Sequence, residues 1–295
     1  MILPILAGPT GSGKTSLTQS LDPDRFEVVS FDSRQVYSEL AVGTTSPTEK
    51  EKDHIPHWLV GILTADKSPN AKQYSTWARD AILSIWNRNK TPFLVCGTGF
   101  YLRAFLMGMF PVPNVPQETK DFAQNLPLSE AVLLLQEKDP KAFQNISETD
   151  GYRIRRALEV VLTGVLWSEV SSHTTGGFLE EFPDLKPKAV WLDWPRVDLY
   201  ARIETRVPGL LKDGMLEETK LVLEKYGPDC PGLHSLGYNF ALDFLYGKID
   251  FNTLLERLAQ SHRNYAKRQV TWFRKDPLLV PMSWDLALKE FTKID

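Results

Sequence analysis

A glycine-rich loop near the start of the chain has the residue types and spacing of a phosphate-binding site. The apolar segment 2–7 runs into a Gly-x-x-x-x-Gly-Lys-Thr pattern, and residues 16–19 continue as a predicted helix, which is the setting of a P-loop. The glycines let several backbone N–H groups point at one anion, and Lys14 adds a full positive charge. Thr15 has the hydroxyl with which such loops hold Mg²⁺. The predicted phosphate-binding residues are Gly8, Pro9, Thr10, Gly11, Ser12, Gly13, Lys14 and Thr15.

Two further predicted strands also end in polar or glycine-rich residues. Residues 32–35 follow one of them, and residues 97–99 follow the next. In an open parallel sheet ligands bind beyond the carboxyl ends of the strands, so the three loops are expected to converge on one cleft. There Asp32 could act as a general base or a metal ligand, and Thr98 could hold a ligand by its hydroxyl. Asp32 could also cap a turn, but its place beside a P-loop favours the functional interpretation.

The elements that position these loops are predicted to be strands that alternate with helices. Such alternation indicates a parallel sheet with both faces covered. The predicted strands are 2–7, 26–31, 92–96 and 188–193, and the helices predicted between them, besides 16–19 and the two short ones described next, are 74–89, 100–107 and 150–162. Residues 168–183 are predicted to be a loop. The rest is predicted to be mostly helical, at about 197–212, 214–225, 238–246 and 251–274.

A proline-rich break interrupts this pattern between residues 111 and 147. Pro111, Pro113 and Pro116 precede two short predicted helices at 117–125 and 129–138. We therefore expect an α/β chain with a P-loop NTPase-like parallel-sheet core, flanked by helices, and a small all-helical insertion. The core would comprise residues 1–110 and 148–295, with a helical C-terminal part, and the insertion residues 111–147.

Composition bounds the class of protein. The 295 residues are 42% hydrophobic and 24% charged, which is ordinary for a globular protein. No apolar run approaches the roughly 20 residues of a membrane span. No basic segment precedes the first strand, so we expect neither a signal peptide nor a membrane partner. Cys96 and Cys230 lack metal-ligand spacing, which favours reduced thiols and a cytoplasmic location.

Charge is distributed unevenly around a net value of −3. Residues 111–150 are acidic, whereas residues 251–275 contain Glu256 as their sole acid beside six basic residues. Those are Arg257, Arg263, Lys267, Arg268, Arg274 and Lys275. The basic stripe suits a nucleic-acid backbone, although such a stripe can also be solvated surface. The apolar positions of the same helix are expected to be core. They are Phe251, Leu254, Leu255, Leu258, Tyr265 and Trp272.

Two arginines in the predicted helix 197–212 could clamp phosphate oxygens. Arg202 and Arg206 are four residues apart and share one helix face, although pairing with Asp198 or Glu204 would also explain them. The strand that ends at Asp193 is a poor Walker-B candidate, and no arginine-rich lid follows. The P-loop ligand therefore need not be ATP or another nucleoside triphosphate, since a diphosphate on another carrier fits the same loop.

Together these residues resemble one family, the bacterial tRNA dimethylallyltransferases, also called tRNA isopentenyltransferases. The similarity runs nearly end to end. The matching segments are residues 8–15, 30–37, 42–44 with 47–48, 96–101, 150–160, 199–206, 236–238 and 263–274. The most specific are Asp-Ser-x-Gln-Val-Tyr at 32–37 and Ala-Lys-Arg-Gln-x-Thr-Trp-Phe-Arg at 266–274.

The resemblance implies transfer of a dimethylallyl group from dimethylallyl diphosphate to N6 of adenosine-37, beside the tRNA anticodon, with release of diphosphate. By this match Lys14 and Mg²⁺ at Thr15 would stabilise the leaving diphosphate, and Arg202 or Arg206 would help from the opposite side. Asp32 matches the family's general base and Thr98 its positioning threonine. A base in a stacked loop must be flipped to react. A monomer is the default expectation.

The resemblance also implies which residues contact the tRNA anticodon stem-loop. These are Asp32, Ser33, Arg34, Gln35, Thr98, Lys120, Tyr152, Arg153, Ile154, Arg155, Arg156, His234, Ser235, Leu236, Gly237, Tyr238, Asn239, Arg263, Lys267 and Arg268. The chain departs from the family pattern in places. Cys96 stands where the family usually has glycine, and Asn239-Phe240 where it has a basic residue followed by Glu.

Three other functions remain open at this level. A P-loop small-molecule kinase would bind ATP, but it would need the Walker-B acid and arginine lid that are absent. An adenylate isopentenyltransferase would act on free nucleotide and would need neither the basic helix nor the insertion. A non-catalytic RNA-binding protein would be expected to have lost Lys14, Asp32 or Thr98, and all three are present.

Overall fold

The computed structural model describes residues 1–294, which form two compact units. The first comprises residues 1–105 and the chain from 182 onward, and the second comprises residues 106–181. The second unit therefore extends beyond the insertion predicted at 111–147. Among the described residues no helix is long and apolar enough to cross a membrane.

A six-stranded sheet lies at the centre of the first unit. All its strand pairs are parallel, and the spatial order is β3-β2-β4-β1-β5-β6. The strands are β1 (Ile2–Ala7), β2 (Phe26–Phe31), β3 (His57–Trp58), β4 (Thr91–Cys96), β5 (Lys186–Leu192) and β6 (Val280–Met282). The α/β class with a parallel sheet is confirmed. Because the strands are parallel, the loops after β1, β2 and β4 meet at the same edge.

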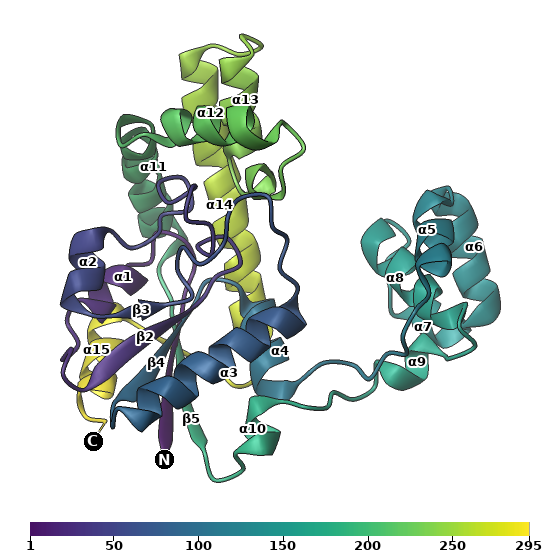
Figure 1. The fold of residues 1–295 in the computed structure, drawn as a ribbon, viewed down its shortest axis with the longest axis horizontal. Helices are drawn as coiled ribbons and strands as arrows, with labels where there is room; N and C mark the ends of the chain where they lie inside the picture. Colours follow the sequence, from purple (N-terminus) through teal and green to yellow (C-terminus); the bar gives the residue numbers. More distant parts are fainter. Residues whose placement is uncertain (295) are drawn as a thin grey trace. The chain divides into compact units, whose positions relative to one another are not determined.

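Helices cover both faces of this sheet (Figure 1). Alternate residues of β2 point to opposite faces, so Phe26 joins a core that includes Phe93 and Phe291, whereas Phe31 packs on Tyr74 and other rings on the opposite face. The first core includes α1 (Lys14–Thr18) and α15 (Trp284–Thr292), and the opposite face is covered by α3 (Ala71–Asn87) and by α4 (Gly99–Met107), whose Phe105 packs on Phe31. A short helix, α2 (Glu49–His54), precedes β3.

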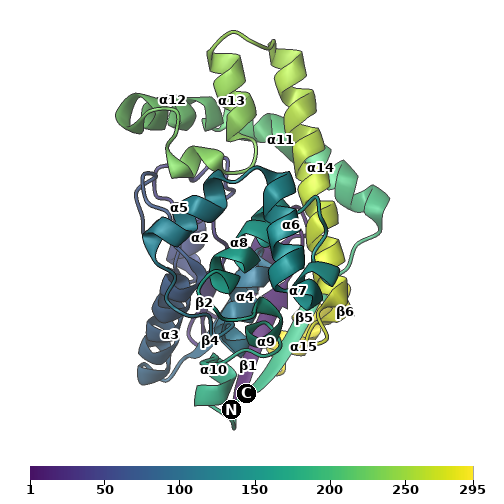
Figure 2. The ribbon, with the colours of Figure 1, turned by 90° about the vertical axis from the view of Figure 1, so that its right-hand side faces the viewer.

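Several helices of the C-terminal part stand beyond the carboxyl ends of the strands, whereas the longest one runs from there down beside the sheet, where its Phe273 packs on Trp191 of β5 (Figures 1 and 2). The longest is α14, which contacts α11 and α13 and carries the basic stripe. Their bounds are α11 (Arg196–Lys212), α12 (Met215–Tyr226), the 3₁₀ turn η1 (Pro231–His234), α13 (Tyr238–Leu245) and α14 (Phe251–Lys275). This arrangement brings residues from late in the chain over the P-loop.

The second unit is all-helical and has a core of its own. Its helices are α5 (Gln117–Asn125), α6 (Leu128–Lys138), α7 (Pro140–Gln144), α8 (Gly151–Val161), α9 (Trp167–Val170) and α10 (Phe178–Glu181). Ile154, Ala157 and Leu158 of α8 pack on Ala123 and Leu135, which explains why the unit includes residues beyond 147. A bridge between Met109 and Thr175 joins the two ends of the unit.

Several sequence predictions need correction. Residues 168–183 are not a continuous loop, because α10 and part of α9 lie within them. The sequence analysis missed β3, β6 and α15, since two- or three-residue strands have too few positions to show a period and the last helix follows an unassigned segment. The apolar positions of the helix 251–275 are only partly core: Leu254 and Leu258 are buried, but Phe251 is 47% exposed.

Candidate active site

A cavity of about 920 Å³ opens at the carboxyl edge of the sheet, within the first unit. Its walls come from the P-loop, from the loops that follow β2 and β4, and from α11 and α14. Of the predicted residues it brings together Thr10, Gly11, Ser12, Gly13, Lys14, Thr15, Asp32, Ser33, Arg34, Gln35, Thr98, Arg202, Arg206, His234, Ser235, Leu236 and Arg268. The predicted convergence of three loops on one cleft is therefore confirmed.

Two tryptophans from late in the chain donate hydrogen bonds to carbonyls of the P-loop. The indole N–H groups of Trp194 and Trp284 donate to the carbonyls of Ser12 and Gly13, at 3.0 and 3.1 Å. Gly13 has a left-handed φ of 89° directly before α1, a conformation that favours glycine. Since the first N–H groups of a helix have no partner within it, this geometry leaves donors available to an anion.

Lys14 lines the cavity and is held by carbonyls of its own loop. Its ammonium donates to the carbonyls of Gly8 and Pro9, at 2.7 and 3.1 Å. These two predicted phosphate-binding residues do not line the cavity themselves. Burial lowers the pKa of Lys14 to about 8, and the nearby carboxylate of Asp32 opposes that fall. The desolvated cation is thus a strong partner for a polyanion.

Asp32 and Thr98 lie side by side at the ends of β2 and β4. The Asp32 Oδ1 accepts the N–H of Arg34 at 2.9 Å, which fixes the carboxylate within its own loop. Thr98 Oγ1 accepts the N–H of Ser33 at 3.3 Å and lies within hydrogen-bonding reach of Tyr265. Burial raises the pKa of Tyr265, and the Asp32 carboxylate raises it further. A carboxylate and two hydroxyls therefore face one end of the cavity, where they can accept and relay a proton.

Gln269 joins the P-loop to the loop after β4, and it was absent from the predicted site. Its Oε1 accepts the N–H of Thr10 and its Nε2 donates to the carbonyl of Gly97, both at 2.8 Å. The bond to Gly97 is buried, and the bond to Thr10 is partly buried at the edge of the cavity. Its only sequence signal was its place in the block at 266–274.

Arg202 and Arg206 both reach the P-loop from α11. Arg202 Nε donates to the carbonyl of Gly11 at 2.8 Å and stacks over Trp194, and Arg206 Nη2 donates to Thr10 Oγ1 at 2.5 Å. Neither pairs with Glu204, which binds Arg263 of α14 at 2.6 Å instead. Two cations beside Lys14 make this end of the cavity suited to a diphosphate.

His262 is a second cavity residue that the sequence analysis missed. It is 2% exposed, and neither ring nitrogen has a hydrogen-bond partner among residues 1–294. Burial lowers its pKa to about 4, and Arg206 contributes to the shift. The wall near it therefore offers a neutral donor and acceptor. The sequence signal that could have identified His262 is a histidine among the apolar positions of the predicted helix 251–274.

Some predicted RNA-contacting residues of the first unit are buried or lie outside the cavity lining. Tyr238 and Gly237 are buried, and Asn239 is exposed but does not line the cavity. On α14, Lys267 and Arg268 are exposed, whereas Arg263 is tied to Glu204. These α14 residues can still present positive charge to a polyanion.

The predicted RNA-contacting residues of the second unit also divide into two groups. Tyr152 is 77% exposed and Arg153 is exposed, but Ile154 is wholly buried in the helical core. Arg155 donates to the carbonyl of Leu126, and Arg156 pairs with the buried Glu159 at 2.6 Å. The Ile154 side chain packs in the helical core, and an RNA contact of the segment 152–156 stays a prediction. Lys120, in α5, is partly exposed.

Comparison with known proteins agrees with this site. A family model described as IPP transferase matches residues 35–276. A tRNA dimethylallyltransferase of Leptospira biflexa serovar Patoc is 65% identical over 295 residues, which are 100% of this chain and 99% of the relative. The chain belongs to the IPP transferase family. Membership agrees with the resemblance noted in its sequence and means that the chain is a transferase.

Solved structures of family members have the same fold. The tRNA isopentenylpyrophosphate transferase of Bacillus halodurans has a TM-score of 0.69 at 28% identity, covering 98% of this chain and 94% of its own. A eukaryotic dimethylallyltransferase, described as acting on tRNA, has a TM-score of 0.81 at 25% identity. That match covers 98% of this chain and 77% of the eukaryotic one.

Proposed function

We propose that this chain transfers the dimethylallyl group of dimethylallyl diphosphate to N6 of adenosine-37 in tRNA and releases diphosphate. The observation that carries the proposal is the shared cavity. Its lining combines a P-loop and two arginines with Asp32 and Thr98, and the Asp32 carboxylate is close enough to Lys14 to affect its pKa. The attacking N6 and the leaving diphosphate are both bonded to C1 of the dimethylallyl group during the reaction. The residues that bind the diphosphate and the residues that accept the N6 proton must therefore share one cavity.

The reaction follows from the charges along the cavity. The N6 lone pair forms a bond to C1 of the dimethylallyl group, and the C1–O bond breaks with its electrons on the diphosphate. Lys14, Arg202 and Arg206 stabilise that growing negative charge. Asp32 takes the N6 proton, and Thr98 with Tyr265 orients the adenine.

Mg²⁺ suits the residues at the P-loop. Thr15 lines the cavity and has a hydroxyl oxygen that can bind Mg²⁺. This donor set fits an ion that takes one protein oxygen and completes its shell with diphosphate oxygens and water. Bound there, Mg²⁺ would neutralise part of the diphosphate charge.

The RNA substrate is proposed to be the anticodon stem-loop. Arg268 of α14 lines the cavity beside Tyr265, and Lys267 is exposed on the same helix. Tyr152 and Arg153 offer an aromatic ring and a cation on the second unit. Such groups bind phosphates and stack on unpaired bases. Adenosine-37 must leave its stack to reach Asp32. The protein is proposed to act as a monomer in the cytoplasm.

The deciding experiment is transfer of labelled dimethylallyl diphosphate, with Mg²⁺, to an anticodon stem-loop that carries adenosine at positions 36–38. Free AMP and the same loop with guanosine at position 37 are the matched controls. Label on the adenosine-37 loop alone supports the proposal. Label on AMP would make the protein an adenylate isopentenyltransferase, and no label on any acceptor would contradict prenyl transfer.

A further inference from the structure

The segment 42–45 contributes to one wall of the cavity, and a carboxylate of α12 binds two of its backbone N–H groups. Gly43, Thr44 and Thr45 line the cavity. The carboxylate of Glu218 accepts the N–H of Val42 at 2.9 Å on Oε2 and the N–H of Gly43 at 2.7 Å on Oε1. These contacts, made across 176 and 175 residues of sequence, are called the Glu218 clamp below.

Tyr238 completes the clamp from α13. Its hydroxyl donates to Glu218 Oε1 at 2.5 Å and lies so close to Gly43 that a Cβ there would come within 2.5 Å of it. All three bonds therefore end on one carboxylate, which accepts at both oxygens. An amide in its place would keep one acceptor and turn an NH₂ group toward N–H or O–H donors.

The clamp continues into the loop that carries Asp32. Thr45 has a left-handed φ of 54°, and its carbonyl accepts Gln35 Nε2 at 3.0 Å. Gln35 Oε1 in turn accepts the hydroxyl of Ser30, the residue two before Asp32, at 3.0 Å. Glu218, the cavity wall and the loop of the candidate base thus form one continuous set of hydrogen bonds.

We propose that Glu218 is a positioning residue of the transfer reaction: it holds the wall 42–45 and, through Thr45 and Gln35, the loop from which Asp32 acts. The proposal rests on the proposed function. The P-loop is held by other residues, namely Gln269, Trp194, Trp284 and Arg202. Loss of the clamp should therefore slow the chemical step more than it weakens diphosphate binding.

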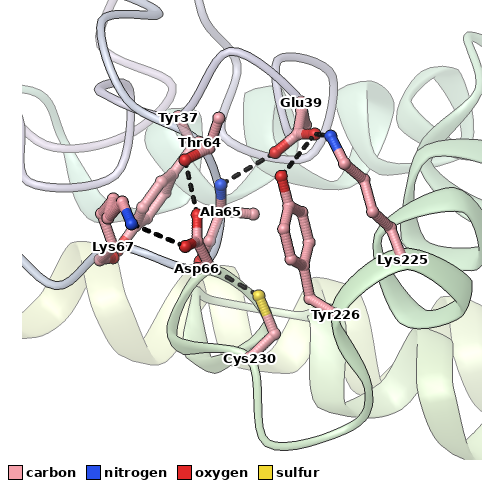
Figure 3. Close-up of polar contacts among 9 residues, drawn as sticks. All are labelled: Tyr37, Glu39, Thr64, Ala65, Asp66, Lys67, Lys225, Tyr226 and Cys230. Carbon is pink, nitrogen blue, oxygen red and sulfur yellow. Dashed lines mark hydrogen bonds and ion pairs between the residues drawn. The ribbon is translucent and has the colours of Figure 1, made fainter.

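A second carboxylate ties the same part of the chain to α12 and offers a matched control. Glu39 accepts Lys225 Nζ at 2.7 Å, the hydroxyl of Tyr226 at 3.1 Å and the N–H of Ala65 at 2.8 Å (Figure 3). None of these four residues lines the main cavity. Lys225→Ala therefore weakens a neighbouring attachment to the same helix and leaves the cavity wall in place.

The experiment compares Glu218→Gln with Lys225→Ala in the full-length protein. Amide hydrogen exchange would report the protection of Val42 and Gly43, and single-turnover transfer to the adenosine-37 stem-loop would report the chemical step. Titration with inorganic diphosphate would report the P-loop. We expect Glu218→Gln to lose protection at both amides and to slow single-turnover transfer about tenfold to a hundredfold, with diphosphate affinity within about threefold of wild type. Lys225→Ala should match wild type in all three.

Each outcome bears on the proposal in a defined way. Lost protection with an unchanged single-turnover rate would overturn it, because the wall would then be structural only. An equal loss of diphosphate affinity would also overturn it. If Glu218→Gln does not fold, Tyr238→Phe removes one of the three bonds and should slow transfer in the same direction. A wild-type protein without transfer activity would contradict the proposed function, and the exchange data would still test the clamp.

Discussion

The carboxylate of Asp32 occupies the space directly above the Cα of Gly97. A Cβ on Gly97 would come within 2.5 Å of Asp32 Oδ2, a distance at which one of the two groups must move. The glycine at the end of β4 therefore permits the candidate base to stand where it does. This contact links the Gly-Thr pair after β4 to the acid after β2.

Gly97→Ala tests this contact. The added methyl group should displace the Asp32 carboxylate and slow single-turnover transfer about a hundredfold, because small misplacements of a reacting group are costly. Diphosphate affinity should change little, because the added Cβ would meet Gln269, which ties the P-loop to Gly97, only at an ordinary 3.8 Å. Gly209→Ala in α11 is the control, because a Cβ there would meet nothing closer than 3.9 Å. A Gly97→Ala enzyme at full rate would contradict the proposed role of the Asp32 position.

Asp32→Asn tests the base itself. The amide keeps the size of the side chain but cannot take the N6 proton, so the transfer rate should fall by about 10² to 10⁴. Binding of the stem-loop, measured by filter retention or fluorescence anisotropy, should stay near the wild-type value. Full turnover of this variant would show that another group removes the proton.

Gln269→Ala should destabilise the site that it bridges. The carbonyl of Gly97 would lose its partner in a buried place, which costs about 1–3 kcal/mol of unfolding free energy, and the partly buried N–H of Thr10 would lose its partner as well. Diphosphate affinity should fall as well, because the P-loop loses its tie to α14. Chemical denaturation and diphosphate titration measure the two effects. Gln260→Ala, on the exposed surface of the same helix, should change neither.

His262 predicts a dependence of stability on pH. Its folded pKa of about 4 lies below the ordinary 6.5, so the unfolded chain binds a proton between these values that the folded chain does not. Its contribution to stability is full above pH 6.5 and is lost as pH falls toward 4, by at most about 3 kcal/mol. The free energy of unfolding of wild type minus that of His262→Asn should decline over this window. A constant difference would contradict the low pKa.

Lys267→Ala should weaken RNA binding without affecting the chemistry. Removal of one phosphate contact should lower affinity for all stem-loops alike and reduce the slope of log K against log salt by about one. The single-turnover rate at saturating RNA should be unchanged. Lys293→Ala, at the exposed end of the C-terminal helix, is a charge-matched control. An unchanged salt slope for Lys267→Ala would remove α14 from the RNA surface.

Most of the sheet and the phosphate half of the site could be predicted because their signals are local. The P-loop pattern lies within eight consecutive residues, and β1 and β2 have the predicted bounds 2–7 and 26–31. Parallel strands also make the convergence of residues 32–35 and 97–99 a matter of topology. The strand β6 was not predicted, because three residues are too few to show the alternation of a strand.

Contacts between distant parts of the chain needed the tertiary structure. Gln269 reaches Gly97 across 172 residues, and Glu218 reaches Gly43 across 175. Periodicity places each of these side chains on a helix face but does not say which loop that face will meet. Tyr265 illustrates the limit, since it was predicted to be core and instead faces the cavity beside Thr98.

The sequence by itself determined the chemistry that this chain can hold: a phosphate loop, an acid and a threonine at neighbouring strand ends, and two arginines on one helix. Their order and spacing are covalent facts, so they were readable without coordinates. Only the tertiary structure decided which residues fix that chemistry in place. Gln269, His262 and Glu218 acquire their roles from burial and from partners brought together by the packing of α11, α12 and α14 over the sheet edge.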